Sequence, residues 1–135
     1  MSSKQTARLK RRLAAIPKKV REAVQPALIK SGDELVDRMR QLAPKDTHAL
    51  ANSIVATPPG QATPAYSQPG GSQVAAENQV LVTAGNADVR YPHLVEYGSV
   101  NAAAQPYFWP AYRLNRKRIA DRVKRAMRKA IREAK

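Results

Sequence analysis

Residues 95–113 read VEYGSVNAAAQPYFWPAYR and hold five of the seven aromatic residues of the chain. Three of the rings, those of residues 107–109, are consecutive and lie between Pro106 and Pro110. Proline is tolerated in the first turn of a helix, so Pro110 predicts a helix start at this point. Base-stacking platforms combine their aromatic residues with Lys or Arg, whereas no basic residue interrupts these rings. The stretch therefore favours docking of a helix over binding of bases.

The same stretch supplies the candidate interface. Gly98 allows a sharp turn of the chain, and the rings that follow it anchor the last helix to a sheet. Tyr and Trp are enriched where subunits meet, so some of these side chains are expected to face a neighbouring subunit. The residues predicted to dock the helix or form a subunit interface are Glu96, Tyr97, Gly98, Pro106, Tyr107, Phe108, Trp109 and Pro110.

Beyond this stretch, the pattern predicts an amphipathic helix to the end of the chain. Its apolar stripe consists of Ala111, Leu114, Ile119, Val123, Met127 and Ile131, with Ala120, Ala126 and Ala130 beside it. Lys and Arg fill the other faces, either as a solvated surface or as contacts to phosphate groups. The candidates for contact with DNA or another polyanion are Arg113, Arg116, Lys117, Arg118, Arg122, Lys124, Arg125, Arg128 and Lys129.

The N-terminal third predicts a second long helix. Its apolar residues recur mostly every three or four positions, as Leu9, Leu13, Ile16, Val20, Val24, Leu28, Leu35, Met39 and Leu42. Pro17 opens a helical segment, and Pro26 predicts a kink or break near residues 22–26. Residues 1–16 form a basic arm or helix, Gly32 weakens the pattern slightly, and the helix ends just before Pro44.

Between the helices, the sequence predicts a small, mainly antiparallel sheet. Asp46 or Thr47 could cap a short helical turn, and residues 53–57 and 79–84 have strand character. A third strand is expected from the intervening loop or from residues 99–105, because two strands alone are marginal. Residues 58–78 are rich in Pro and Gly and predict a flexible loop. Residues 91–99 fit either a short helix that begins at Pro92 or an irregular edge strand.

Composition supports one α+β domain over residues 1–135. The formal charge is +14, with net charges of +8 over residues 1–45, −3 over 46–112 and +9 over 113–135. A field of this size attracts polyanions. Large apolar side chains are scarce, so association with other copies is expected to supplement a thin core. No apolar run approaches the roughly 20 residues that cross a bilayer, so no membrane contact is expected.

Signals for enzymatic chemistry are weak. The chain has no Cys, which removes thiolate catalysis and Cys-based zinc sites. His93 and Glu96 are three residues apart and could share a proton or provide half a metal site, but no third ligand is apparent. The Gly-rich phosphate-binding motifs and the nucleophile motif GxSxG are missing from the sequence. We expect no catalytic residues, no metal and no cofactor.

The order of motifs resembles the tail-completion, or head-to-tail joining, family of tailed bacteriophages. Its "AP…TG.L..SI", "Y…VE.GT" and "PF..PA" elements resemble three groups of residues in this chain. The matching residues are Ala43, Pro44, Thr47, Leu50, Ser53 and Ile54; Tyr91, Val95, Glu96, Tyr97, Gly98 and Ser99; and Pro106, Tyr107, Pro110 and Ala111. His48 stands where the family usually has Gly, Ser99 replaces Thr, and Tyr107 replaces Phe.

The resemblance implies a non-enzymatic virion protein, assembled in the host cytoplasm as a homo-oligomeric ring in the neck. Its partners would be other neck, portal-side or tail proteins, with non-specific contact to the genomic DNA in the channel. A free-standing basic module that binds nucleic acid is the alternative, and a hydrolase or metal enzyme is a third, less favoured one.

Overall fold

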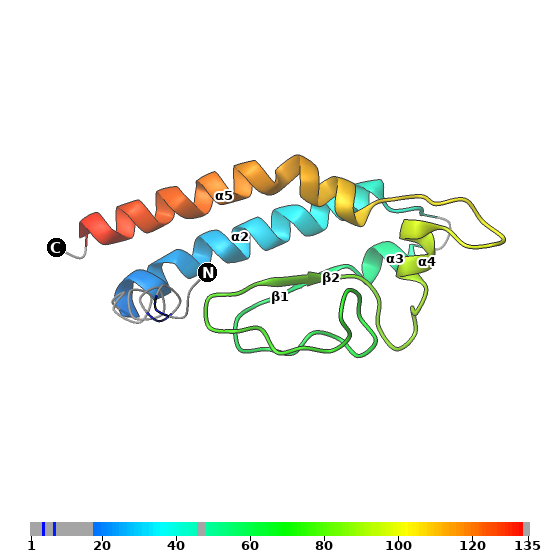
Figure 1. Ribbon diagram of the computed structural model, residues 1–135, viewed down its shortest axis with the longest axis horizontal. Helices are drawn as coiled ribbons and strands as arrows, with labels where there is room; N and C mark the ends of the chain where they lie inside the picture. Colours follow the sequence, from blue (N-terminus) through cyan, green and yellow to red (C-terminus); the bar gives the residue numbers. More distant parts are fainter. Residues whose placement is uncertain (1–3, 5–6, 8–17, 46–47, 134–135) are drawn as a thin grey trace.

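The computed structural model describes residues 4, 7, 18–45 and 48–133 of the chain. It has α+β architecture, as the sequence predicts: in chain order, one long helix precedes a small antiparallel sheet and another follows it (Figure 1). The elements in chain order are α2 (Lys18–Leu42), α3 (Ala49–Asn52), β1 (Val55–Thr57), β2 (Leu81–Thr83), α4 (Pro92–Tyr97) and α5 (Phe108–Glu133).

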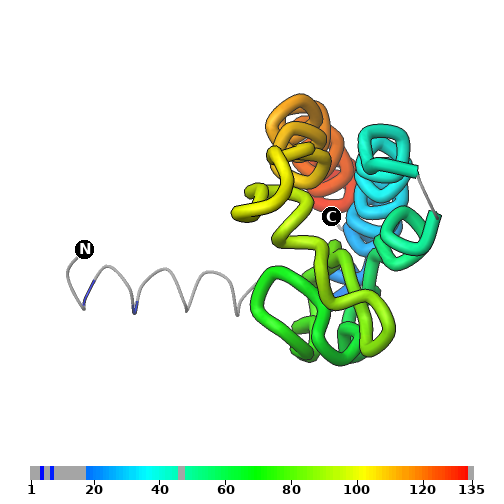
Figure 2. The backbone as a smooth tube through the Cα atoms, turned by 90° about the vertical axis from the view of Figure 1, so that its right-hand side faces the viewer, coloured from blue at the N-terminus to red at the C-terminus, as the bar shows by residue number. Residues whose placement is uncertain are grey.

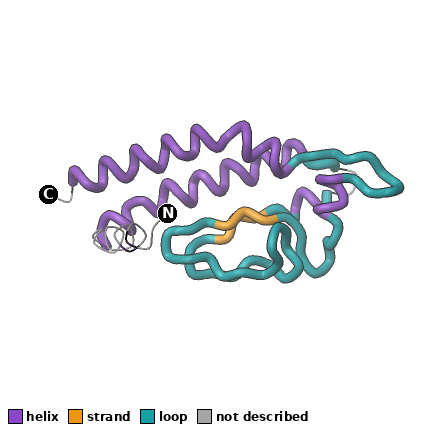
Figure 3. The backbone as a smooth tube through the Cα atoms, viewed as in Figure 1, coloured by secondary structure: helices purple, strands orange, loops and turns teal. Residues whose placement is uncertain are grey.

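The two long helices run antiparallel along each other above a layer made mostly of loops (Figures 1 and 3). Seen along their axes, α5 and α2 lie side by side and the green loops lie beneath them (Figure 2). The C-terminal helix was expected to pack on the sheet, but α5 lies mainly against α2, and α2 contacts both strands. Two adjacent small residues of α2 take part in these contacts. Ser31 accepts a hydrogen bond from Arg122 of α5, and Gly32 packs against the sheet.

Gly32 allows the close approach of α2 to the sheet. A Cβ atom at this position would lie 2.7 Å from Cγ1 of Val80 and 3.2 Å from Cβ of Ala56. The sequence predicts Gly32 only as a weak point of the helix, whereas the structure shows that it packs against the sheet. Pro26 lies within α2 without breaking it, so the helix is continuous from Lys18 to Leu42.

The apolar stripes are only partly as predicted. Val20, Val24, Leu35 and Met39 of α2 are buried, but Leu42 is exposed. In α5, the stripe residues Leu114, Met127 and Ile131 are 80%, 39% and 48% exposed, and Asn115 is buried beside Leu114. The other inward positions of α5 are buried or half-buried, namely Phe108, Ala111, Ile119, Arg122, Val123, Ala126 and Ala130. Leu9, Leu13 and Ile16 lie outside the described residues.

The sheet consists of two strands, with Val55 opposite Thr83, Ala56 opposite Val82 and Thr57 opposite Leu81. The prediction of a third strand is wrong within the described residues, although the 58–78 loop forms one antiparallel bridge from Gln68 to Ala84 and another within itself, from Ala62 to Val74. Further backbone hydrogen bonds cross this loop, from Gly60 and Thr63 to residues 75 and 73. The loop therefore pairs only at isolated positions, because its Pro and Gly residues interrupt longer strands.

The short helix α3 follows a residue in left-handed geometry. His48 has φ 61° and ψ −4°, the conformation that Gly adopts most easily and that costs other residues strain. His48 thus takes a left-handed conformation at the position where the resembled family usually has Gly. The predicted caps Asp46 and Thr47 lie outside the described residues. α2 ends at Leu42, as Pro44 predicts.

Candidate functional site

The candidate site is the corner at which α4, the 99–106 arm and the start of α5 meet. α4 begins at Pro92, so the helical interpretation of residues 91–99 is confirmed. It ends at Gly98, whose φ of 82° and ψ of 170° are unfavourable for residues with a side chain. A Cβ atom there would also lie 2.9 Å from the Ala104 nitrogen. Glycine is therefore required both by the backbone conformation and by the available space.

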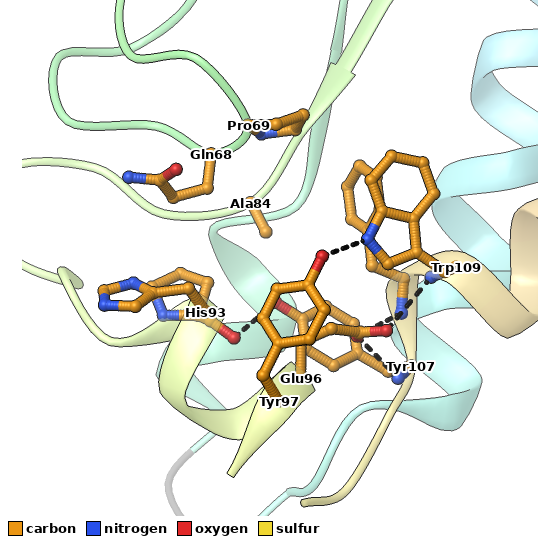
Figure 4. A pocket seen from close by; sticks show the side chains of 10 residues that line it. Gln68, Pro69, Ala84, His93, Glu96, Tyr97, Tyr107 and Trp109 are labelled. Carbon is orange, nitrogen blue, oxygen red and sulfur yellow. Dashed lines mark hydrogen bonds between the residues drawn. The ribbon is translucent and has the colours of Figure 1, made fainter. Parts of the chain in front are cut away.

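The carboxylate of Glu96 caps the N-terminus of α5 from another helix (Figure 4). Its Oε1 accepts hydrogen bonds from the backbone nitrogens of Tyr107, at 2.9 Å, and Phe108, at 2.8 Å. Its Oε2 accepts a longer one, 3.3 Å, from the nitrogen of Trp109. The first N–H groups of a helix have no partner within the helix and carry its positive dipole end, so a buried carboxylate suits this position. Glu96 thereby joins the corner to the last helix.

The three consecutive rings pack at right angles to one another. Neighbouring rings from Tyr107 to Phe108 and from Phe108 to Trp109 have centroids 6.4 Å and 5.0 Å apart, and Trp109 contacts Tyr112 in the same way at 6.2 Å. Tyr107 is 1% exposed and is among the largest fully buried side chains of the described residues. Its burial, together with the nearby charge of Glu96, raises the pKa of its hydroxyl well above the ordinary value. The rings therefore anchor α5 in the core.

A cavity of about 150 Å³ lies beside this cap. Its wall includes Pro69 and Ala84 from the loop layer, His93 from α4, and the side chains of Tyr97 and Trp109 (Figure 4). Trp109 donates a 2.6 Å hydrogen bond from Nε1 to the hydroxyl of Tyr97 across the mouth. The arrangement can hold an apolar side chain against rings. It brings no group of three potential metal ligands together within the described residues.

The predicted interface residues divide into a buried and an exposed group. Tyr107, Phe108 and the Glu96 carboxylate are buried and hold α5, whereas Trp109, Pro110 and Gly98 are half-buried. Tyr97 and Pro106 are exposed, so only these present most of their surface to a partner. Three exposed apolar residues that the sequence does not assign to the interface lie near Tyr97 in the chain. They are Tyr91 just before α4, Leu94 in α4 and Val100 in the arm, and Val100 is fully exposed.

The predicted polyanion contacts on α5 also divide. Arg122 donates a 2.6 Å hydrogen bond from Nη2 to Oε2 of Glu34 and another to Ser31 of α2, and its side chain is only 14% exposed. Arg118 lies 3.3 Å from Oε1 of the same carboxylate. Hydrogen bonding to Arg122 lowers the pKa of Glu34, against the opposing effect of burial. Arg122 thus joins two helices, and its hydrogen-bonding groups are used within the protein. The other seven candidates are exposed.

The structural roles of two further residues, Ser53 and Arg40, were not predicted from the sequence. Ser53 is buried, donates to the Leu50 carbonyl at 2.6 Å, and accepts a hydrogen bond from the Gly85 nitrogen. Arg40 donates to the carbonyls of Ala51 and Ile54 at 3.1 and 2.9 Å. The Ser-Ile pair of the first motif was a signal for Ser53, but nothing in the spacing of α2 indicated the partner of Arg40.

Fold and site together define a small α+β protein, in which buried polar groups are used for capping and helix pairing and apolar side chains remain on an outer corner. A family model described as "Bacteriophage HK97-gp10, putative tail-component" matches residues 7–98. The chain belongs to this HK97-gp10-like family of phage tail components, which are parts of the virion. The match includes the first motif and the second motif as far as Gly98, whereas Ser99, the third motif and α5 lie beyond it.

The remaining comparisons add no relatives. Neither the search of curated proteins nor that of solved structures found a match. Within the described part of the chain, no helix has the length and apolar character needed to span a membrane.

Proposed function

We propose that this chain is a non-enzymatic structural protein that forms a ring in the neck of a tailed-phage virion, where it completes the tail and joins it to the head around the DNA channel. Membership of a family of phage tail components is the observation that carries the proposal. It favours a virion component over a free-standing module that binds nucleic acid.

The exposed apolar surface beside α4 and on the arm supports assembly. Leu94, Tyr97 and Val100 lie close together in the chain and are exposed to solvent. Exposed apolar patches commonly mark contacts with other proteins, and aromatic residues are enriched in them. A ring of identical subunits requires a contact between two different patches on neighbouring copies. We assign one of these patches to this surface.

The chemistry of the corner supports a structural role. The Glu96 carboxylate accepts backbone hydrogen bonds from the start of α5, and the Tyr107 hydroxyl is directed to the Pro92 carbonyl at 3.4 Å. A catalytic acid or base must reach a proton of the substrate, but these groups are buried and serve the fold. His93 is exposed on α4, and no hydrogen bond joins it to Glu96 in the described part of the chain.

Mass spectrometry of purified virions tests the proposal directly. We expect the chain in particles at a copy number that fits one ring, and we expect a phage with the gene deleted to accumulate filled heads and tails that remain separate. Absence of the chain from purified particles overturns the proposal. A monomer in solution does not, because assembly can require a partner surface.

A matched pair of substitutions tests the interface. Leu94→Asn changes the proposed patch, whereas Leu114→Asn changes an exposed leucine of α5 outside that patch. Both positions are exposed, so both variants should fold with similar thermal midpoints. We expect Leu94→Asn to reduce incorporation into particles in a complementation assay and Leu114→Asn to leave it unchanged. Equal incorporation of both variants contradicts the assignment of this patch.

A further inference from the structure

We infer that the end of the helix pair where α2 begins and α5 ends binds duplex DNA through its phosphate backbone. This basic end consists of Lys18, Lys19, Lys124, Arg125, Arg128, Lys129 and Arg132. The inference deepens the proposed function and rests on it, because the virion channel supplies the DNA. The sequence predicts polyanion contacts along all of α5. The inference restricts them to one end of the helix pair and adds Lys18 and Lys19 of α2.

The fold brings the two basic ends of the sequence together. α2 and α5 are antiparallel, so the first turn of α2 lies at the same end of the pair as the last turns of α5 (Figure 1). Contacts along the pair agree with this arrangement. Ser31 meets Arg122 near the middle, and Val20 and Val24 of α2 line one hollow together with Val123 and Met127 of α5. The aromatic corner lies at the opposite end of the pair.

The cations of the basic end on α5 have no acidic partners. Residues 124–132 read KRAMRKAIR and hold five basic residues and no acidic one. Within the described residues, none of the five forms an ion pair, whereas Arg118 and Arg122 share Glu34. Like charges three or four positions apart on a helix repel one another. The helix dipole favours cations only in the last turn, so it explains Arg132 but not the four before it.

The spacing of these cations fits a DNA backbone. Arg125, Arg128, Lys129 and Arg132 are three or four positions apart, so they lie on one side of the helix, where they line a shallow hollow. At a rise of about 1.5 Å per residue, residues 124–132 span about 12 Å. Duplex DNA carries one negative charge per about 1.7 Å of its axis, or about seven over this distance. Over this length the duplex, counted over both strands, therefore carries more charges than the five cations of residues 124–132.

The chemistry of the basic end favours duplex DNA over two other ligands. Protein interfaces are depleted of charged residues at their centres, whereas interfaces with DNA are polar and strongly basic. Here five cations surround Met127 and Ile131, which are 39% and 48% exposed. Single strands are held by aromatic rings on which bases stack. All aromatic residues of the chain fall between positions 66 and 112, so this end offers none.

Titration of the full chain against a fluorescent 30-base-pair duplex, at 50 to 200 mM salt, tests the inference. The key variant replaces Arg125, Arg128 and Lys129 by Gln, and the control replaces Arg113, Arg116 and Lys117 by Gln. Both remove three positive charges from exposed positions of α5. If each residue of the key set neutralises one phosphate, the slope of log K against log salt falls by about 2.7, and affinity at 0.1 M salt falls by two to three orders of magnitude. The control should lower the slope by less than about 1.

Unchanged circular dichroism and thermal midpoints establish that both variants fold. Equal losses in the two variants overturn the inference, because the binding would then follow net charge and not this surface. So does equal or tighter binding of poly-glutamate, which indicates an acidic protein partner, or tighter binding of a single strand of the same length. No binding at 50 mM salt also overturns it. The proposed function is decided separately, by the presence of the chain in particles.

Discussion

Replacing Glu96 tests the central feature of the corner. Glu96→Ala removes the acceptor of two buried N–H groups, those of Tyr107 and Phe108, and of a third that is partly buried at Trp109. A buried donor left without a partner costs about 1–3 kcal/mol, and loss of the charge at the helix dipole costs about 0.3–2 kcal/mol. The direct sum for the two buried donors is thus about 2–8 kcal/mol.

The adjacent cavity reduces this cost. Its volume of about 150 Å³ is large enough for water to reach the exposed N–H groups after truncation. We therefore expect the free energy of unfolding to fall by about 3 kcal/mol, near the lower end of the range, which is a factor of over about 100 in the folding equilibrium. Small domains are stable by about 5–15 kcal/mol, so Glu96→Ala should remain folded but be strongly weakened.

Glu96→Gln separates the hydrogen bonds from the charge. The amide oxygen can accept from Tyr107 and Phe108 in place of Oε1, but the amide NH₂ then faces the Trp109 N–H group. We expect a loss of about 1 kcal/mol. Glu133→Gln, an identical substitution at an exposed residue in the last turn of α5, serves as the control and should change stability by less than about 0.5 kcal/mol.

Urea unfolding, followed by the fluorescence of the single tryptophan and by circular dichroism, measures these differences. Trp109 lies in the capped turn, so its emission reports on the corner, whereas circular dichroism reports on all helices. The comparison is made at one protein concentration for all variants. A loss for Glu96→Ala no larger than that for Glu133→Gln refutes the assignment of Glu96 as the cap of α5.

Three further substitutions test neighbouring groups. The raised pKa of Tyr107 keeps its hydroxyl protonated in the folded chain, so only the unfolded chain loses this proton above pH 10. The free energy of unfolding should therefore fall by about 1.4 kcal/mol per pH unit in that range. Tyr107→Phe should remove this pH dependence in alkaline urea titrations. The lowered pKa of Glu34 gives stability that is present above its ordinary value of 4.5 and lost as the pH falls through the folded value, so Glu34→Gln should flatten the acid side of the same profile. Gly98→Ala should cost about 1–3 kcal/mol in thermal unfolding, because Ala is strained at φ 82° and its Cβ meets Ala104; no loss contradicts this.

The sequence could predict the elements that depend on local chemistry. The 3.6-residue period predicts both long helices, Pro44 predicts the end of α2, and Pro92 fits the start of α4. It could not predict interactions that connect distant segments. Glu96 meets residues 107–109, and Arg122 meets Glu34 across 88 positions, so neither pairing leaves a periodic signal. The third strand was wrongly predicted for the same reason: pairing of Gln68 with Ala84 depends on how the loop folds back, which the local sequence does not indicate.

The misplacement of Leu114 in the α5 stripe is linked to one of these distant contacts. The apolar pattern predicts that Leu114 points inward, because leucine is more hydrophobic than the neighbouring Asn115. The orientation of the helix is instead fixed at its first turn, where the Glu96 carboxylate holds three successive N–H groups and Tyr107 and Phe108 are buried. From that start, positions 111, 115, 119 and 122 point inward at intervals of three or four. Asn115 is tolerated there because its Nδ2 donates a 2.7 Å hydrogen bond to the Ala111 carbonyl. A buried carboxylate on α4 therefore holds the turn from which α5 presents this face to α2, and the Arg122–Glu34 pair holds the same face further along.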